Sequence, residues 1–214
     1  MKDVFLNLTR FAKANGLDVE ELLHRTTFDD SGHVIGLNLT SWTEVFDLSP
    51  LADLGTLGEL VLNGSRVRDF SPMAKLTGLK VLHLSYTSVA DLTPLAGLGA
   101  LEHVTLTNTL VRDITPLGEL GALKILALSM TRTKDLRTLA KLNVLETLFL
   151  CDTPVRDLTP LAGLGTLEEL FINDTPVSDL TPLAGLEALT LVSLRNTRVR
   201  DLAPVTRPGL KLIR

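Results

Sequence analysis

Residues 91–112 read DLTPLAGLGALEHVTLTNTLVR, and their opening motif, Asp-Leu-Thr-Pro-Leu, returns in the same or a similar form every 22 residues. A fixed short period indicates one supersecondary unit stacked on copies of itself. Because the period has no insertion, we predict a single solenoid rather than two globular domains. The recurring Asp lies at Asp47, Asp69, Asp91, Asp113, Asp135, Asp157, Asp179 and Asp201.

The later part of each period has the alternating pattern of a β-strand. In residues 91–112 the alternation is centred on Val104 and Leu106, with Leu101 before them. The same frame recurs from Leu57 to Leu194. One coil alone cannot bury these aliphatic side chains, so we expect the stacked coils to bury them in one continuous column.

The earlier part of each period turns the chain back. Thr93 before Pro94 is typical of an N-cap followed by Pro at the first helical position. The next residues, LAGL, are too few for a stable α-helix, so we expect a single 3₁₀ or α turn with Leu92, Leu95 and Leu98 facing inward. The recurring Asp is expected to bond nearby backbone or the same position one coil on, which is a structural role.

The full pattern, LxxLxLxxTxVxDLTPLAxL, resembles the leucine-rich repeat family over residues 34 to about 205. Within that family it is most similar to the 22-residue internalin-like and SDS22-like bacterial subtype. The resemblance implies an α/β solenoid. Its expected form is a right-handed arc with a parallel β-sheet on the concave side and short 3₁₀ or turn segments on the convex side.

One column of the repeat departs from that family, which usually has Asn where this chain has Ser or Thr. Asn can offer both a donor and an acceptor to buried turn backbone, whereas Thr offers one hydroxyl. We therefore expect a ladder of Thr side chains that bond between coils, though more weakly. The positions are Ser65, Thr87, Thr109, Thr131, Thr153, Thr175 and Thr197.

Covers are expected at both ends of the array, because open strand edges and exposed Leu columns aggregate. Residues 1–31 are predicted to form an N-terminal helical cap, with a second short helix from about Asp18 to His24. One face of the first helix holds Val4, Leu8, Phe11 and Ala12.

The repeat array is predicted to occupy residues 32–205, and residues 206–214 a short C-terminal strand or cap. The last strand edge is expected to be protected by charge or, alternatively, paired with another chain. The charged residues that would protect it are Arg207, Lys211 and Arg214.

Composition narrows the class of partner and the compartment. The net charge of −4 and the sequence pI of about 5.6 argue against nucleic acid as the main partner. No stretch approaches ~18 apolar residues, so no membrane span is expected. The start MKDVFLNLTRFAKANG lacks the pattern of a signal peptide, and the single Cys151 fits a reducing compartment. We expect a cytoplasmic protein, or a secreted one if a leader has been removed.

Basic residues gather in the turn that follows each strand, so stacking should place them along one edge. One interpretation is a solvated edge whose Arg side chains pair with the recurring Asp. The other is a basic stripe for an acidic partner. The residues are Arg66, Arg68, Arg112, Arg132, Lys134, Arg156, Arg198 and Arg200.

The concave sheet face is the predicted site of partner binding. Its outward columns include Ile125, Phe149, Phe171 and Leu191, and the repeat does not require apolar residues there. Polar residues around them would form a rim, as in protein interfaces. Alternatively, these side chains pack across strands with no partner. The predicted partner-binding residues are Glu59, Val61, His83, Tyr86, His103, Ile125, Met130, Phe149, Asp152, Glu169, Phe171, Asn173, Asp174, Leu191 and Arg195.

One coil differs from its siblings. Around Asp135 the chain reads DLRTLAKL, so Arg137 and Thr138 replace Thr-Pro, and Thr133 replaces the usual Val. This difference is either drift within the repeat or a second contact site on the flank near Met130.

These observations favour a non-catalytic protein–protein interaction module, monomeric and without a cofactor, in a regulatory or scaffolding role. An alternative is a secreted or surface adhesin or effector of the internalin-like kind. A third is a metal-dependent enzyme that uses His83 and His103 with Glu59. The two histidines are expected roughly 6–8 Å apart, which is loose for shared metal ligation, so we predict no catalytic, cofactor-binding or metal-binding residues.

Overall fold

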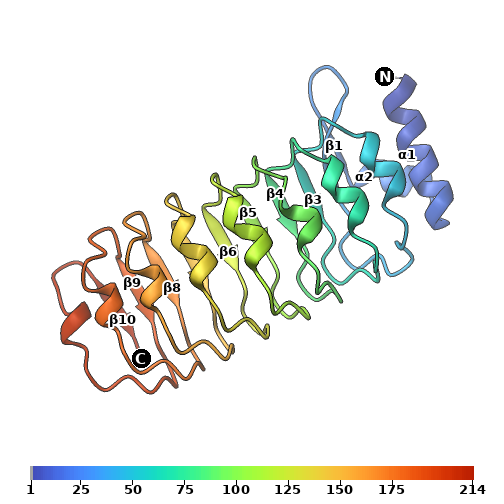
Figure 1. Cartoon of the computed structure of the whole chain (residues 1–214). Coiled ribbons are helices and arrows are strands. Elements are labelled where there is room, and N and C mark those ends of the chain that lie inside the picture. Colours follow the sequence, from blue (N-terminus) through green and yellow to red (C-terminus); the bar gives the residue numbers. More distant parts are fainter. Residues whose placement is uncertain (1) are drawn as a thin grey trace.

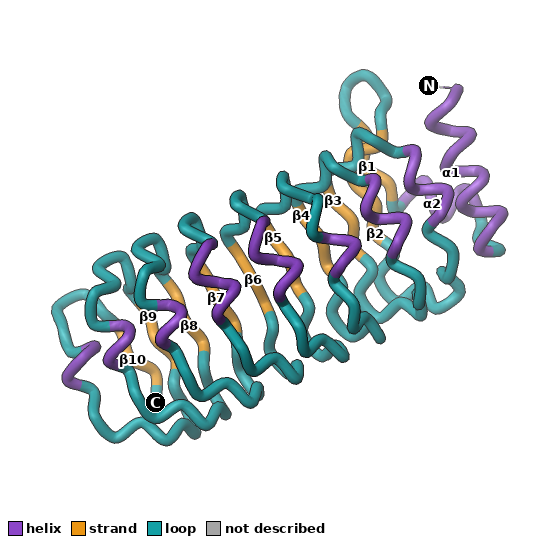
Figure 2. The backbone as a smooth tube through the Cα atoms, in the orientation of Figure 1, coloured by secondary structure: helices purple, strands orange, loops and turns teal. Residues whose placement is uncertain are grey.

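The computed structural model describes residues 2–214, with side chains from residue 6 onward, so the side chain of Val4 lies outside the described residues. The chain winds into regular coils stacked along one axis, with its two ends at opposite ends of the stack (Figure 1). Each coil places a strand on one face and a short helix on the other (Figure 2). The predicted solenoid is therefore confirmed.

A ten-stranded sheet forms one face, and its strand order follows the sequence from β1 to β10. All neighbours from β2 to β10 pair in parallel, whereas β1 pairs antiparallel with β2. The strands are β1 (Thr26–Phe28), β2 (Val34–Asn38), β3 (Glu59–Val61), β4 (Val81–His83), β5 (His103–Thr105), β6 (Ile125–Ala127), β7 (Thr147–Phe149), β8 (Glu169–Phe171), β9 (Leu191–Ser193) and β10 (Lys211–Ile213). Strand β1 was not predicted, because the cap was expected to be wholly helical.

Short 3₁₀ helices form the opposite face, which confirms the single turn predicted after the recurring Asp. Each begins close to a Pro that presets the backbone φ, except in the irregular coil around Arg137. They are η1 (Ser49–Asp53), η2 (Ser71–Lys75), η3 (Thr93–Leu95), η4 (Thr115–Glu119), η5 (Arg137–Lys141), η6 (Thr159–Leu161), η7 (Thr181–Leu183) and η8 (Ala203–Val205).

The core lies between the two faces and consists mainly of Leu columns. In the coil of residues 91–112, Val104 and Leu106 from the sheet side are completely buried. Leu92, Leu95 and Leu98 from the 3₁₀ side are at most 2% exposed. Burying one such side chain is worth roughly 1.5–3 kcal/mol, and every coil contributes a similar set, so the stack supplies its own core.

The recurring Asp bonds the backbone of its own turn. In all eight coils its Oδ1 accepts the backbone N–H two residues on, at 2.8–3.0 Å. This confirms the first of the two predicted roles. The predicted N-cap at Thr93 is wrong, because Thr93 is the first residue of η3 and its N–H is the donor to Asp91. The N–H groups that a capping Thr93 would serve bond backbone carbonyls instead, Leu95 N to Leu92 O and Ala96 N to Thr93 O.

The Thr column bonds within coils, so the predicted ladder between coils is wrong. Each hydroxyl donates to the carbonyl three residues earlier in its own coil, as Thr109 Oγ1 does to Leu106 O at 2.7 Å. Thr87, Thr131, Thr153, Thr175 and Thr197 do the same. A Thr hydroxyl is held close to its backbone, so this carbonyl is within reach and the next coil is not. The buried Ser65 Oγ has no partner.

The N-terminal cap consists of α1 (Lys2–Asn15) and α2 (Val19–His24). Asn15 is 3% exposed and joins the cap to the array. Its Oδ1 accepts the N–H groups of Phe46 and Asp47, and its Nδ2 donates to the carbonyls of Phe11 and Asp47. Among the described residues, no helix is both long and apolar enough to cross a membrane.

At the C-terminal end, β10 pairs with β9 and forms the last strand of the sheet. Arg207 does more there than supply charge. Its guanidinium donates to the carbonyls of Ala184, Leu186 and Leu189, which belong to the preceding coil. The side chain thereby fastens the short last coil to the backbone of the coil before it.

Candidate functional site

The sheet face presents the two outward columns that the sequence predicted. In the first column Glu59 pairs with Val81, then His103, Ile125, Thr147, Glu169 and Leu191 follow. In the second, Val61 pairs with His83, then Thr105, Ala127, Phe149, Phe171 and Ser193 follow. The parallel register is uniform, so residues 22 positions apart lie side by side on one surface.

Phe149 and Phe171 stack face to face, with ring centroids 4.5 Å apart and an interplanar angle of 11°. Strands lie only about 4.8 Å apart, which lets rings at equivalent positions stack in this way. Ile125, Leu191 and both Phe side chains are half-buried rather than fully exposed. The cross-strand packing expected under the alternative interpretation is therefore present. Part of each ring still faces solvent, and no other element of the described chain covers it.

Three positions past the end of each strand from β2 to β9, one residue has a left-handed backbone. The φ values at these positions lie between 53° and 69°. The residues are Ser41, Gly64, Tyr86, Asn108, Met130, Asp152, Asp174 and Asn196, which we call the left-handed column. Each N–H from Ser41 to Asp174 donates to a carbonyl of the next coil, as Met130 N does to Cys151 O at 2.7 Å. The backbone of this column is structural, while its side chains point out from the edge of the sheet face.

Tyr86 and Met130 break the chemical preference of the left-handed column. Gly, Asn and Asp enter this conformation most easily, and bulky side chains rarely do. Tyr86 is 61% exposed and Met130 is 46% exposed, so little packing offsets the strain. Two large side chains thus stand at the margin of the sheet face in a conformation that other residue types would adopt at lower energy. The sequence placed both residues beyond the strand but gave no sign of their backbone conformation.

The predicted polar rim is only partly free to contact a partner. Asp152 and Asp174 are exposed and Glu169 is half-buried. The Oδ1 of Asn173 accepts Ser193 Oγ and the N–H of Arg195, both at 2.8 Å, so its amide oxygen serves the next coil. Arg195 Nε lies 3.3 Å from the carbonyl oxygen of Arg214, which draws the side chain toward the end of the sheet.

The first half of the sheet face is polar. His83 Nδ1 lies 3.0 Å from Thr105 Oγ1, and His103 lies beside Val81 on the neighbouring strand. Burial lowers the pKa of His83 below its ordinary value; the charge of Glu59 partly opposes this and that of His103 adds to it. No group of three His, Cys, Asp or Glu side chains among the described residues could hold a metal ion.

Val61 is 8% exposed and offers a partner little surface. Asn38 and His83 occupy the same column on either side of it. Its outward position in the strand pattern was predicted correctly, but its burial depends on those neighbours and not on the pattern.

The basic residues along the loop edge are exposed and unpaired. Within the part of the chain that the structure describes, none of the eight forms a side-chain hydrogen bond or an ion pair. The expectation that they pair with the recurring Asp is therefore wrong. Each Asp carboxylate is turned toward the N–H of its own 3₁₀ turn, so it does not reach across to the Arg.

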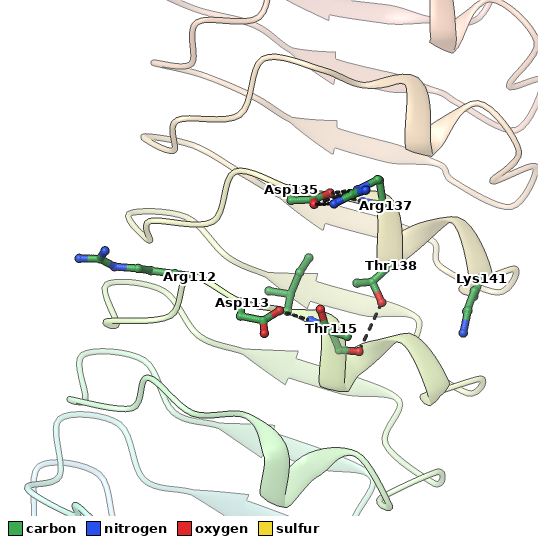
Figure 3. Close-up of a pocket in the computed structure, with 8 residues that line it drawn as sticks. Arg112, Asp113, Thr115, Asp135, Arg137, Thr138 and Lys141 are labelled. Carbon is green, nitrogen blue, oxygen red and sulfur yellow. Dashed lines mark hydrogen bonds and ion pairs between the residues drawn. The ribbon is translucent and has the colours of Figure 1, made fainter.

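The irregular coil opens a pocket on the 3₁₀ side, between η4 and η5 (Figure 3). Arg137 forms a double hydrogen bond with Asp135 and lowers the pKa of that carboxyl to about 2. Lys141 Nζ pairs with Glu119 Oε1 at 2.6 Å. Arg112 extends away from the pocket (Figure 3). Two of the cations that line the pocket are thus neutralised in pairs, while the carboxylate of Asp113 accepts the N–H of Thr115 and, among the described residues, has no cation beside it.

No protein-family model and no curated protein sequence matches this chain. Solved structures do match. An internalin (inlF) from Listeria monocytogenes is 26% identical, with a TM-score of 0.76 over 83% of this chain and 52% of its own. Internalin C2 from the same organism is 28% identical, with a TM-score of 0.70 over 90% of this chain and 92% of its own. The chain thus spans about half of the first structure and nearly all of the second.

A more distant structure has the same fold. It is the ectodomain of the plant membrane receptor kinase GASSHO1/SCHENGEN3 from Arabidopsis thaliana, solved in complex with CASPARIAN STRIP INTEGRITY FACTOR 2. It is 21% identical, with a TM-score of 0.69 over 80% of this chain and 22% of its own.

Proposed function

We propose that this chain, a leucine-rich repeat protein of the internalin-like type, is a non-catalytic module that binds a protein partner on the concave face of its sheet. The observation that carries the proposal is the stacked pair Phe149 and Phe171, with Met130 on the margin of the same surface. None of the three is required by the repeat, and most coils have smaller or polar residues at these positions.

Two further observations support a protein as the ligand. The face is broad and open, with an apolar centre and polar residues on both sides, which is the composition of protein interfaces. The plant receptor ectodomain with the same fold was solved in complex with CASPARIAN STRIP INTEGRITY FACTOR 2. That likeness is one of fold, so it supports the type of ligand and not its identity.

The test is a double substitution, Phe149→Ala with Phe171→Asp, in an affinity-capture experiment from an extract of the producing cell. We expect capture of the partner to be abolished. Because the two rings are half-buried and stacked, we expect the melting temperature to fall by only about 5 °C.

A matched control removes apolar side chains from another surface. Leu110 and Val144 are 53% and 37% exposed on the loops outside the sheet. Leu110→Ala with Val144→Asp should leave capture intact. Capture that survives the Phe substitutions would refute the proposal, as would equal loss of capture in both double variants.

A second candidate function is a surface adhesin or secreted effector, which the similarity to internalins favours. It uses the same face and differs in location. We propose the cytoplasmic role; fractionation of the producing cells with an antibody to the chain distinguishes the two, since an effector would be found outside the cytoplasm.

A further inference from the structure

Two neighbouring coils carry the same frame of Glu, Phe and Asp. Residues 146–152 read ETLFLCD and residues 168–174 read EELFIND. In both, Glu immediately precedes the strand, Phe is the last residue of the strand, and Asp lies in the left-handed column. The equivalent stretches of the other coils lack this combination; KVLHLSY, EHVTLTN, KILALSM and TLVSLRN stand in their place.

The register brings the two frames together around the stacked rings. Phe149 pairs with Phe171, and Thr147 pairs with Glu169. Side chains two residues apart on a strand point to the same face, so Glu169 stands beside Phe171. Asp152 and Asp174 follow at the opposite end of the strands, in the left-handed column. The stacked rings therefore have carboxylates on two sides.

These carboxylates have no cationic partner. Among the described residues, no ion pair involves Glu146, Asp152, Glu168, Glu169 or Asp174. Asp174 Oδ1 accepts only the neutral Asn196 Nδ2, at 2.8 Å. Neither stretch contains Lys or Arg.

The cations at the two ends of this surface are engaged elsewhere. On one side the Nζ of Lys124 lies 3.7 Å from Glu102 Oε2, and Glu102 also pairs with Lys80. On the other side Arg195 bonds the carbonyl of Arg214. No cation of the described chain lies within ion-pair distance of the carboxylates around the two rings, so this surface carries local negative charge, although it is apolar at its centre.

We propose that the occupant of this surface is a basic segment of a protein partner, with an Arg or Lys over the stacked Phe149 and Phe171 and its charged head directed to Asp152 and Asp174. The inference rests on the proposed function, because it specifies the chemistry of the partner on the same face. The methylene stem of Arg or Lys packs on apolar surface, here the outward edges of the two stacked rings, while its charged head reaches polar groups. An acidic partner would bring carboxylates close to Asp152, Glu169 and Asp174, and the repulsion between like charges disfavours its binding.

The experiment selects binders from a random dodecapeptide display library on the intact protein. We expect the selected peptides to be enriched in Arg or Lys next to an apolar residue. Their affinity for the protein, measured by fluorescence anisotropy with synthetic peptides, should fall as NaCl is raised.

Charge-neutral variants test the carboxylates without changing their shape. In Asp152→Asn/Glu169→Gln/Asp174→Asn we expect the Kd of the selected peptides to rise about tenfold or more. The matched control, Asp30→Asn/Glu44→Gln/Glu187→Gln, removes the same total charge from exposed positions elsewhere and should leave the Kd unchanged.

A second variant, Phe149→Ala/Phe171→Ala, separates the failure of this inference from that of the proposed function. Alanine is used at both positions because an added carboxylate would itself attract a basic peptide. Neutral or acidic peptides that this variant no longer binds would overturn the basic partner and keep the site. If the selected peptides bind this variant as tightly as they bind the parent protein, both the basic partner and the proposed binding face would be overturned. A selection that enriches no peptide would overturn the inference, since it requires an extended basic segment.

Discussion

The recurring Asp column and the left-handed column lie at the two ends of the segment that joins each strand to the next 3₁₀ turn. They differ in whether the side chain or the backbone holds the fold. In the recurring Asp column all eight side chains are the same, and all eight bond the backbone of their own turn. In the left-handed column the backbone does the structural work, since its N–H groups bond the next coil, and the side chains range from Gly64 to Tyr86. The comparison shows that repetition marks side chains held by the fold, while variation marks side chains left for other contacts.

The same comparison places the candidate site. Asp152 and Asp174 belong to the variable column and have no cation, whereas Asp135 in the constant column is paired with Arg137. Tyr86 and Met130 are bulky residues where the backbone favours Gly, Asn or Asp. Residues that oppose a local preference without evident structural gain are candidates for function.

The largest expected effect comes from the junction at which the constant column begins. Asn15→Ala would leave the N–H groups of Phe46 and Asp47 and the carbonyl of Asp47 without their partner. Buried polar groups left unpaired cost about 1–3 kcal/mol each before relaxation, so we expect a loss of roughly 3 kcal/mol. Urea unfolding measures it. Asn7→Ala on the same helix is the control, and equal losses in both variants would show that Asn15 is not a clamp.

The second prediction uses acid to separate the two columns. Hydrogen bonds from the hydroxyl and backbone N–H of Ser71 or Thr93 lower the pKa of Asp69 and Asp91, and other members of the column are lowered in the same way. A lowered folded-state pKa means that the stability is complete above the unfolded value of about 3.9 and is lost as pH falls through the folded value. We therefore expect a plateau in the free energy of unfolding above about pH 5 and a decline below about pH 4.

Urea unfolding at a series of pH values checks this decline, and variants assign it. Replacing the constant-column carboxyls by Asn, as in Asp69→Asn/Asp91→Asn, should make the decline shallower. In the left-handed column, Asp152→Asn removes a carboxylate that makes no hydrogen bond with the described residues. This variant should lose stability below about pH 4 as steeply as the parent does. A decline of the same steepness in the Asp69→Asn/Asp91→Asn variant would assign acid sensitivity to other carboxyls.

The third prediction concerns substitutions that are expected to increase the stability of the protein, whereas most substitutions decrease it. Tyr86→Asn and Met130→Asn should each stabilise the protein by roughly 0.5–1 kcal/mol, because Asn adopts the left-handed conformation with less strain. The same variants should weaken binding of the partner. The control, Asn108→Ala, removes a residue suited to this conformation and should destabilise. Lower stability in both Asn variants would show that Tyr86 and Met130 contribute packing instead.

The smallest expected effect concerns Ser65, which follows the only Gly of the left-handed column within the described residues. The N–H of Ser65 donates to the carbonyl of Leu62. In other coils the equivalent carbonyl accepts the Thr hydroxyl, so the Oγ of Ser65 is buried without a partner. Ser65→Ala should therefore be neutral or stabilise by up to about 1 kcal/mol. Thr153→Ala, which breaks a bond to Leu150 O, should instead destabilise by about 1 kcal/mol. Calorimetric melting of the two variants decides whether the contrast is real.

Much of the fold could be predicted because it follows from the 22-residue repeat. The Leu frame, the turn after the recurring Asp and the outward columns of the sheet follow from hydrophobic alternation at a fixed interval. Strand β1 was missed, since TTF carries no copy of the repeat. The clamp at Asn15 was also missed, because an Asn before Gly16 is equally typical of a helix that ends there.

The candidate site was predictable as a location and less so as chemistry. Strand parity placed Phe149 and Phe171 on the outward face, but their stacking and half-burial depend on the neighbouring strand. The shared Glu, Phe and Asp frame was visible in the sequence. What this frame could bind depended on whether a cation lies beside the carboxylates. The spacing of residues does not show this, because an ion pair depends on the directions of the side chains.

By itself, the sequence determined the period, the register and the identity of the buried columns, because each depends on which residues recur every 22 positions. Only the tertiary structure decided which hydroxyl bonds which carbonyl, that the stripe of Arg stands unpaired, and that Tyr86 and Met130 occupy left-handed backbone. The physical reason is what each kind of interaction depends on. The period shows which side chains face inward in every coil, whereas hydrogen bonds, ion pairs and backbone conformation depend on side-chain directions and φ values that spacing alone does not give.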